Sequence, residues 1–313
     1  MNWAGAQNRL ENGLTVSSSW GSGPPSAATL TYERTENTGK KTDSLGDRMK
    51  CYEGVPRHFL TRRVPVIIRI DGKAFHTFTR GFNKPFDEIL MSSMQSTMQY
   101  LCENIQGCVF GYTQSDEITL VLTDYAKITT DAWFGYNVQK MTSIAASMAT
   151  FAFNMAFQNS AYAFMLNNSG HCEEDSAEFA LCQAYSKAIN RGAMFDARVF
   201  SVPKDEVCNC LIWRQQDAVR NSIEGVGQAY FSANELHKKS TNMIQEMLFQ
   251  THGVNWNDFP VECKRGSCCY RVPVTETIDV PNKEPVTVTR NKWRIDHEIP
   301  TFTQDREFVE RWL

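Results

Sequence analysis

The apolar residues of this chain recur at two spacings, and the spacing predicts which segments are strands and which are helices. The β-branched run over 66–70 predicts a buried strand that ends abruptly at Asp71-Gly72. Apolar residues at steps of three and four from Leu90 to Leu101 predict a helix over 87–104. The same reading predicts strands over 108–112, 118–122 and 195–202, a terminal hairpin over 271–275 and 286–289 with Pro281-Asn282 in its turn, helices over 45–54, 131–157, 175–190, 205–231 and 236–250, loops over 73–86 and 167–174, and a turn over 255–260.

The order of these elements predicts the fold class. Strand, helix, strand, strand, helix and strand follow one another, which is typical of a ferredoxin-like α+β sheet with helices on one face. Gln114-Ser115-Asp116 is expected to form the turn between the second and third strands. In such a sheet the end of the first strand and this turn lie side by side. Asp71 and Asp116 are therefore expected within reach of one shared ion.

The composition excludes some classes of protein. The chain has 313 residues, of which 42% are apolar, and a formal net charge of −3. Any nucleic-acid site must therefore be a local patch, because the whole surface offers no basic field. The ten cysteines lack the spacing of a zinc site and are expected to be reduced and structural. With no secretory signal pattern and no convincing membrane span, we expect a cytoplasmic protein.

The acidic residues at the two strand ends are the candidate chemistry. Two carboxylates that share a pair of Mg²⁺ ions are typical of phosphoryl and nucleotidyl transfer. Because Mg²⁺ takes oxygen ligands and keeps several waters, Asp71, the Gly72 carbonyl and Asp116 are a sufficient set. The backbone of the glycine loop would then cradle phosphates, and Ser115 would add a hydroxyl. The further nucleotide-binding candidates are Lys73, Ala74, Phe75, His76, Lys84 and Lys140.

Each half of this pattern also fits an ordinary turn. Asp-Gly after a strand, or Ser-Asp-Glu in a hairpin, is usually solvated surface. His76 fits a structural role as well as it fits stacking near a base or phosphate. The combination of two acidic positions at neighbouring strand ends is what favours a metal site.

Several segments together resemble the tRNA(His) guanylyltransferase family and its bacterial and phage guanylyltransferase-like relatives. The resemblance spans about residues 44–271. The segments are RIDGKAFHTF at 69–78, Lys84-Pro85 with Asp87, GYTQSDEITLVL at 111–122, FDARVF at 195–200, WRQQDAVRNS at 213–222, KST at 239–241, NWND at 255–258 and KRG at 264–266.

The resemblance implies a polymerase-like palm that adds GTP, or another nucleoside triphosphate such as ATP, to the 5′ end of tRNA in the 3′-to-5′ direction. It implies two Mg²⁺ ions at Asp71, Gly72 and Asp116, and it makes Glu117 the second acid beside Asp116. It also implies a dimer or tetramer. We expect a flexible segment over 1–43, a catalytic palm over 44–200, and a helical, RNA-facing extension over 201–313 that ends in the small hairpin. Weaker candidates for RNA contact are Arg214, Asn221, Lys238, Lys239 and Arg265.

One departure from the family pattern bears on the substrate. Members of eukaryotic type carry His-Ile-Asn-Asn after Trp-Arg-Gln, whereas this chain has Val219-Arg220-Asn221-Ser222. The difference favours template-dependent repair of shortened tRNA 5′ ends over addition of G to tRNA(His). Two other hypotheses remain open at this point. One is a nucleotide cyclase on the same palm, and the other is an RNA-binding module without activity.

Overall fold

The computed structural model describes residues 44–168, 176–278 and 286–313. The chain divides into two compact units, the first ending at Pro56 and the second spanning Arg57–Leu313. The first unit contributes the helix α1 (Ser44–Gly54), none of whose residues is buried. The boundary expected near residue 200 lies inside the second unit. The segment 1–43, expected to be flexible, and most of the loop expected over 167–174 fall outside the described residues, as does the turn at Pro281-Asn282.

A six-stranded antiparallel sheet is the centre of the second unit. Its spatial order is β4-β1-β3-β2-β5-β6, so β1 lies between β4 and β3. The mixed helix and antiparallel-sheet fold expected from the sequence is confirmed. The strands are β1 (Val66–Gly72), β2 (Cys108–Gln114), β3 (Glu117–Leu122), β4 (Phe195–Ser201), β5 (Ser267–Ile278) and β6 (Val286–Asp296).

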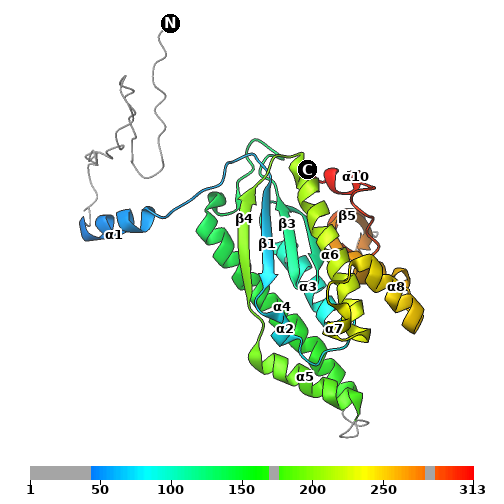
Figure 1. The fold of residues 1–313 in the computed structure, drawn as a ribbon. Helices are drawn as coiled ribbons and strands as arrows, with labels where there is room; N and C mark the ends of the chain where they lie inside the picture. Colours follow the sequence, from blue (N-terminus) through cyan, green and yellow to red (C-terminus); the bar gives the residue numbers. More distant parts are fainter. Residues whose placement is uncertain (1–43, 169–175, 279–285) are drawn as a thin grey trace, which may run out of the picture. The chain divides into compact units, whose positions relative to one another are not determined.

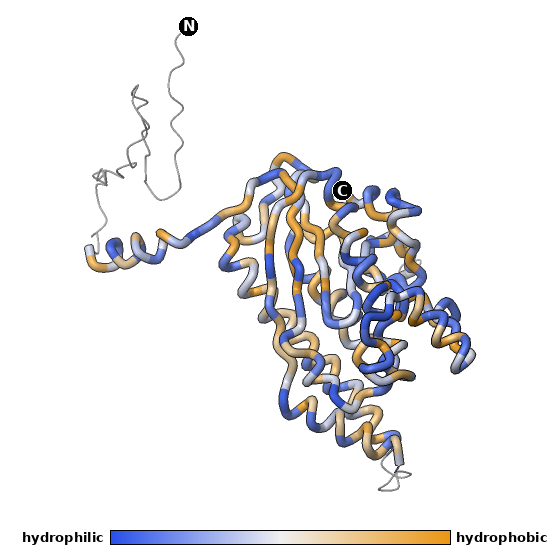
Figure 2. Tube along the Cα trace, in the orientation of Figure 1, coloured by the Kyte–Doolittle hydropathy of each residue, from blue (hydrophilic) through white to orange (hydrophobic). Residues whose placement is uncertain are grey.

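Helices cover both faces of the sheet (Figure 1), and the prediction of helices on one face is wrong. Ile68 and Ile70 of β1 pack in a core with α3, α4 and α5, while Ile67 points the other way and packs with Leu211 of α6. Hydrophobic colour along the central strands in Figure 2 reflects this double burial. The physical reason is that β1 is apolar at successive positions, and a strand that alternates would bury only one side.

The helices mostly follow the predicted segments, with three main differences, one of them an additional helix. They are α2 (Phe75–Phe78), α3 (Glu88–Asn104), α4 (Val138–Asn168), α5 (Ala177–Arg191), α6 (Glu206–Tyr230), α7 (Ala233–Leu236), α8 (Thr241–His252), α9 (Val261–Arg265) and α10 (Glu307–Glu310), with short 3-10 turns at Trp133–Tyr136 and Trp256–Asp258. The loop expected over 73–86 contains α2. Nine described cysteines are free thiols.

Local backbone chemistry explains the other two differences. The helix expected from residue 131 begins only at Val138, because Phe134, Gly135 and Tyr136 adopt positive φ angles of 49°, 59° and 61°. It then continues to Asn168, beyond the expected end. The helix expected over 236–250 begins only at Thr241, since Ser240 accepts the Met243 amide as the cap of α8. Among the described helices, none is both long and apolar enough to span a membrane.

Candidate functional site

The structure brings the two predicted carboxylates to adjacent strand ends. The Gly72 amide donates to the Asp116 carbonyl oxygen at 3.0 Å, which fastens the end of β1 to the β2–β3 turn. Within the sheet, Asp71 lies in register opposite Glu117 on β3 and Asp196 on β4. Directly paired residues share a face of a sheet, so these three side chains form one acidic row on the α6 side.

The Asp-Gly loop leaves no room for a side chain at position 72. A Cβ on Gly72 would lie 2.2 Å from the ring of Phe75. After it, the Lys73 amide donates to the Met194 carbonyl oxygen at 2.8 Å, and Ala74 adopts a left-handed conformation that leads into α2. The Lys73 amide is thus already hydrogen-bonded within the protein. The predicted phosphate contacts would have to come from the backbone amides that follow it.

The electrostatics of the carboxylates favour a bound cation. Burial raises the pKa of Asp116, and the negative charge of Asp71 raises it as well. Ser115 donates to Asp116 Oδ1 at 3.1 Å, which opposes that shift. Among the ion pairs of the described residues, none involves Asp71 or Asp116. Two close carboxylates without a protein cation fit the hard-oxygen preference of Mg²⁺.

The ligand set is small. In the described part of the chain, no group of three or more His, Cys, Asp or Glu side chains is arranged to hold a metal ion. The residues that fit Mg²⁺ are therefore Asp71 and Asp116 with the Gly72 carbonyl, and water would complete the coordination.

A pH-dependent stability follows from the raised pKa of Asp116. A carboxyl whose folded-state pKa lies above its unfolded value stabilises the fold at low pH, and that contribution is lost as pH rises through the folded pKa. Asp116→Asn has no charge to desolvate. We expect the Tm of metal-free Asp116→Asn minus that of wild type to increase between about pH 4 and pH 7. Calorimetry in a chelator measures this difference, and a difference that does not change with pH would contradict the electrostatic assignment.

A pocket of about 370 Å³ opens beside the acidic turn. Its walls come from α2, the loop before α3, the β2–β3 turn, α6 and α9. Of the predicted nucleotide-binding and RNA-binding residues, it is lined by Phe75, His76, Lys84, Ser115, Asp116 and Asn221. Its volume suits a small organic ligand.

The buried Asp87 holds the loop that carries Lys84 into this pocket. Its carboxylate accepts the Leu90 amide at 2.9 Å as the N-cap of α3, and the Asn83 amide at 3.1 Å. The Tyr185 hydroxyl donates to the same carboxylate at 2.8 Å. Three donors from three elements fix the loop, so Asp87 has a structural reason to follow the lysine-proline pair.

The structure does not bring Lys140 to this site. Its ammonium lies 5.9 Å from the centroid of the Phe134 ring, in the segment before α4. The part of α4 near the Asp-Gly loop is Asn154, whose side chain donates to the Ala193 carbonyl oxygen at 2.9 Å. Residues 140 to 154 of a helix span about 21 Å. Lys140 is therefore about this far along α4 from the part of the helix beside the Asp-Gly loop.

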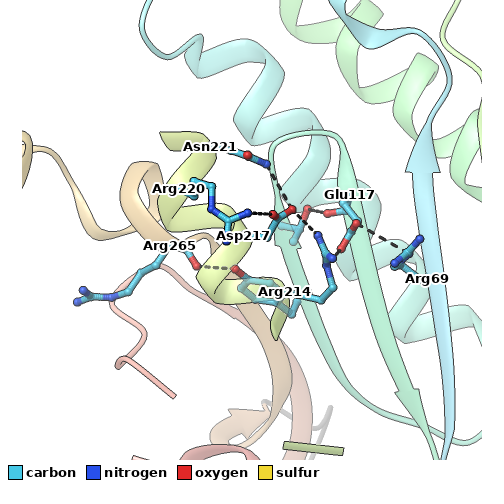
Figure 3. Close-up of polar contacts among 9 residues, drawn as sticks. Arg69, Glu117, Arg214, Asp217, Arg220, Asn221 and Arg265 are labelled. Atoms are coloured by element: carbon cyan, nitrogen blue, oxygen red, sulfur yellow. Dashed lines mark hydrogen bonds and ion pairs between the residues drawn. The ribbon is translucent and has the colours of Figure 1, made fainter. Parts of the chain in front are cut away.

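Glu117 and Arg214 form a buried ion pair (Figure 3). Arg214 Nε donates to Glu117 Oε1 at 2.6 Å, and Arg214 Nη2 donates to Asp217 Oδ2 at 2.7 Å. Burial raises the pKa of Glu117, whereas the charges of Arg214 and Arg69 lower it. Arg214, predicted to contact RNA, is only 5% exposed and its guanidinium is used within the protein. Its neighbours in the sequence, Trp213 and Gln215, gave no sign of the distant acid that it meets.

The other RNA candidates lie at the surface or at pocket rims. Asn221 is exposed on α6 and Arg265 donates to the Ile299 carbonyl oxygen at 3.0 Å. Lys238 and Lys239 are exposed and border a second hollow of about 560 Å³. Their contact with RNA stays a prediction.

Two arginines beside the acidic row escaped the sequence analysis. Arg69 and Arg198 lie in register opposite each other, two residues from Asp71 and Asp196 on the same face. The side chain of Arg69 is 18% exposed and that of Arg198 54%. The Arg69 Nε atom is buried and has no hydrogen-bond partner in the described structure. The alternation Arg-x-Asp on β1 and Asp-x-Arg on β4 was the signal that could have revealed them.

The sequence of this chain is similar to those of known proteins. The family model described as tRNAHis guanylyltransferase, Thg1, matches residues 46–203. A probable tRNA(His) guanylyltransferase of Dictyostelium discoideum is 26% identical over 252 residues, which cover 76% of this chain and 86% of that protein.

Two solved structures of a bacterial tRNA(His) guanylyltransferase (Thg1)-like protein are also similar. The structure in complex with ATP is 39% identical, with a TM-score of 0.67. The structure in complex with GTP is 39% identical, with a TM-score of 0.63. Each covers 86% of this chain and 99% of its own.

Proposed function

Because this chain belongs to the tRNA(His) guanylyltransferase family and is a nucleotidyltransferase, we infer that it adds a nucleotide from GTP or another nucleoside triphosphate to the 5′ end of tRNA. Growth is in the 3′-to-5′ direction. The 3′-hydroxyl of the triphosphate attacks the activated 5′ phosphate of the RNA, and AMP or pyrophosphate leaves. The observation that supports this best is the position of Asp71 and Asp116, two carboxylates without an ion-pair partner in the described structure. The backbone hydrogen bond from the Gly72 amide to the Asp116 carbonyl oxygen, at 3.0 Å, holds their two strand ends together.

The residues of the site divide into two roles. Asp71, Asp116 and the Gly72 carbonyl would hold two Mg²⁺ ions. When bound, such ions lower the pKa of an attacking hydroxyl and neutralise a triphosphate. Lys84 and Ser115 present a cation and a hydroxyl to the pocket beside these ligands. That arrangement suits a nucleotide whose phosphates point toward the acidic turn.

Arg69 and Arg198 fit a second set of phosphates on the α6 side. Like charges directly opposite each other in a sheet repel, and a bound anion removes that cost. Arg69 Nε faces Glu117 Oε2 at 3.9 Å and Arg198 Nη2 lies 3.5 Å from Asp196 Oδ1, so a phosphate would be bound by the other N–H groups of the two guanidinium groups. A reaction between an activated 5′ end and a triphosphate needs more than one phosphate site, and this pair supplies it.

We expect Arg198→Ala to raise KM for the nucleoside triphosphate about tenfold, equivalent to about 1.4 kcal/mol, with a smaller change in kcat. Loss of one charge-assisted contact to phosphate is the reason. Steady-state kinetics with varied GTP measures it. Arg306→Ala, which removes a partly exposed arginine paired with Glu310 at 3.1 Å and hydrogen-bonded to Asn209 at 2.8 Å, is the matched control. Equal KM values for Arg198→Ala and wild type would refute this phosphate site.

The RNA substrate is a tRNA shortened at its 5′ end. The support is the sequence Val219-Arg220-Asn221-Ser222, which lacks the histidine of the eukaryotic pattern, together with the 39% identity to a bacterial Thg1-like protein. On α6, Asn221 and Ser222 line the pocket beside Asp116. The departure thus lies in the wall of the candidate site and not at a distance from it.

Self-association is part of the proposal. Four apolar side chains of α4 share one helix face and are 39–59% exposed. They are Ile144, Phe151, Met155 and Tyr162. A second copy of the chain is the occupant that suits a long apolar helix face. Light scattering of the full chain tests this, and a monomeric mass at micromolar concentration would refute it.

The decisive test uses GTP labelled at the γ-phosphate, with intact and 5′-shortened tRNAs, with and without ATP. Addition in the 3′-to-5′ direction keeps the triphosphate of the incoming GTP at the new 5′ end, so the γ label enters the RNA. Ordinary 5′-to-3′ synthesis releases it as pyrophosphate. We expect label in shortened tRNA. A cyclic nucleotide formed without RNA would identify a cyclase, and tight RNA binding without turnover would identify a binding module.

A further inference from the structure

Glu117 lies where a third metal ligand would be expected. It follows Asp116 directly, and it lies in register opposite Asp71 on the same face of the sheet. Directly opposite residues in antiparallel strands have Cβ atoms about 5 Å apart. A free carboxylate at this position would therefore be close enough to compete with water for a cation held by its two neighbours.

Its carboxylate is instead occupied by arginine. Oε1 accepts from Arg214 Nε at 2.6 Å, and Oε2 lies 3.9 Å from Arg69 Nε. Glu117 and Arg214 are 8% and 5% exposed, so water competes little for this pair. In the described residues no three acidic, histidine or cysteine side chains converge as a metal site, although three acids are neighbours in the sheet.

Arg214 is itself held in place. Its Nη2 donates to Asp217 Oδ2 at 2.7 Å, and its guanidinium lies 4.2 Å from the centroid of the Trp213 ring. Figure 3 shows the guanidinium between the two carboxylates, with Asp217 continuing toward Arg220 and Asn221. A planar fork of donors suits this bridging position, which an ammonium group could not fill in the same way.

We propose that Arg214 is a positioning residue that withholds Glu117 from the metal ions, so that the site keeps two carboxylates and its exchangeable waters. This rests on the proposed function in one respect, the assignment of Asp71 and Asp116 as metal ligands. Water positions on the ions are where substrate oxygens must enter. A third carboxylate would fill one of them, binding the ion more tightly and leaving less room for the reacting groups.

The test measures metal binding directly, without RNA or nucleotide, using Mn²⁺ as the probe. Electron paramagnetic resonance gives the Mn²⁺ affinity, and line broadening in ¹⁷O-enriched water gives the number of waters on the bound ion. Four variants are compared with wild type: Arg214→Met, Glu117→Gln, the double variant Arg214→Met/Glu117→Gln, and Arg306→Met as the matched control.

We expect Arg214→Met to bind Mn²⁺ about tenfold more tightly with one water fewer, since affinity follows the number of charged ligands. The bound Mn²⁺ ion should carry as many waters in the double variant as in wild type. The same number is expected for Glu117→Gln and for Arg306→Met. An extra water in Glu117→Gln would show that Glu117 is already a ligand and overturn the proposal. So would an unchanged water number in Arg214→Met, because tighter binding alone reports only the lost positive charge.

Two further readouts separate this role from folding and from the proposed function. Thermal unfolding identifies any variant that fails to fold. Arg214→Lys then replaces it, because lysine keeps the charge but lacks the planar fork, and an intermediate Mn²⁺ affinity is expected. If neither the wild type nor any of the variants binds Mn²⁺, the assignment of Asp71 and Asp116 as metal ligands is wrong. If wild type binds Mn²⁺ but transfers no nucleotide, the proposed function fails while the role of Arg214 stands or falls on the water number.

Discussion

Asp71→Asn and Asp116→Asn are each expected to lower kcat/KM for nucleotide incorporation by about 10³-fold, equivalent to about 4 kcal/mol of activation free energy. Each carboxylate lies at a strand end with no cation from the described chain to neutralise it, so its charge is available to a metal ion. Asparagine keeps the size of the side chain and removes that charge. Single-turnover incorporation of labelled GTP into 5′-shortened tRNA measures the loss.

The charge effect must be separated from damage to the fold. Because burial and mutual repulsion disfavour the ionised form of Asp116, the metal-free Asp116→Asn variant should unfold at or above the wild-type temperature at neutral pH. Asp205→Asn is the control, since Asp205 is exposed and its side chain makes no cap hydrogen bond at the start of α6. Incorporation within twofold of wild type by either active-site variant would rule out the two-carboxylate metal site.

Gly72→Ala is expected to have the second largest effect, with a stability loss of about 1–3 kcal/mol. The added Cβ would lie 2.2 Å from the ring of Phe75. That ring cannot move aside, because it packs against Phe78, Phe153 and Phe195 at centroid distances of 5.2, 5.5 and 5.2 Å. The backbone at the Gly72 carbonyl, the proposed metal ligand, must shift instead. A displacement of about 1 Å at that position is expected to lower the rate about 100-fold.

Urea unfolding and kcat/KM on the same preparation measure both consequences. Gly54→Ala serves as the control, since a Cβ at Gly54 meets nothing within 4 Å. Gly72→Ala/Phe75→Leu removes most of the clash and should recover part of the activity even though it weakens the aromatic cluster. If Gly72→Ala has wild-type stability and rate, the close approach of loop and ring does not constrain the site.

The metal pair could be predicted because each half is local in sequence. Asp71-Gly72 ends an apolar strand and Ser115-Asp116 fills a hairpin turn, so a simple antiparallel order was sufficient to place them together. The same run of apolar residues in β1 also indicates burial on both faces of the sheet. The prediction of helices on one face did not take this into account. The pairing of β1 with β4 was also needed to bring Arg69 and Arg198 into one row, and it depends on a strand more than 120 residues later.

The surroundings of two predicted site residues depend on long-range packing. Arg214 lies 97 residues from Glu117 in the sequence, and an arginine on an exposed-looking helix gives no local sign of a buried partner. Lys140 is a different case. It lies near the start of α4 beside Phe134, and its own sequence does not show which end of the helix approaches the Asp-Gly loop.

The order of strands has a consequence for synthesis of the chain. β2 carries the acidic turn at one end, and among the described strands its outer edge is paired by β5 alone, through Gly111–Thr113 with Ser267–Cys269. During synthesis, about 150 further residues must therefore be made before β5 can pair with the outer edge of β2. Exposed edges recruit other strands. A nascent chain with its nucleotide-binding half already made is thus most exposed to mispairing before its C-terminal hairpin emerges.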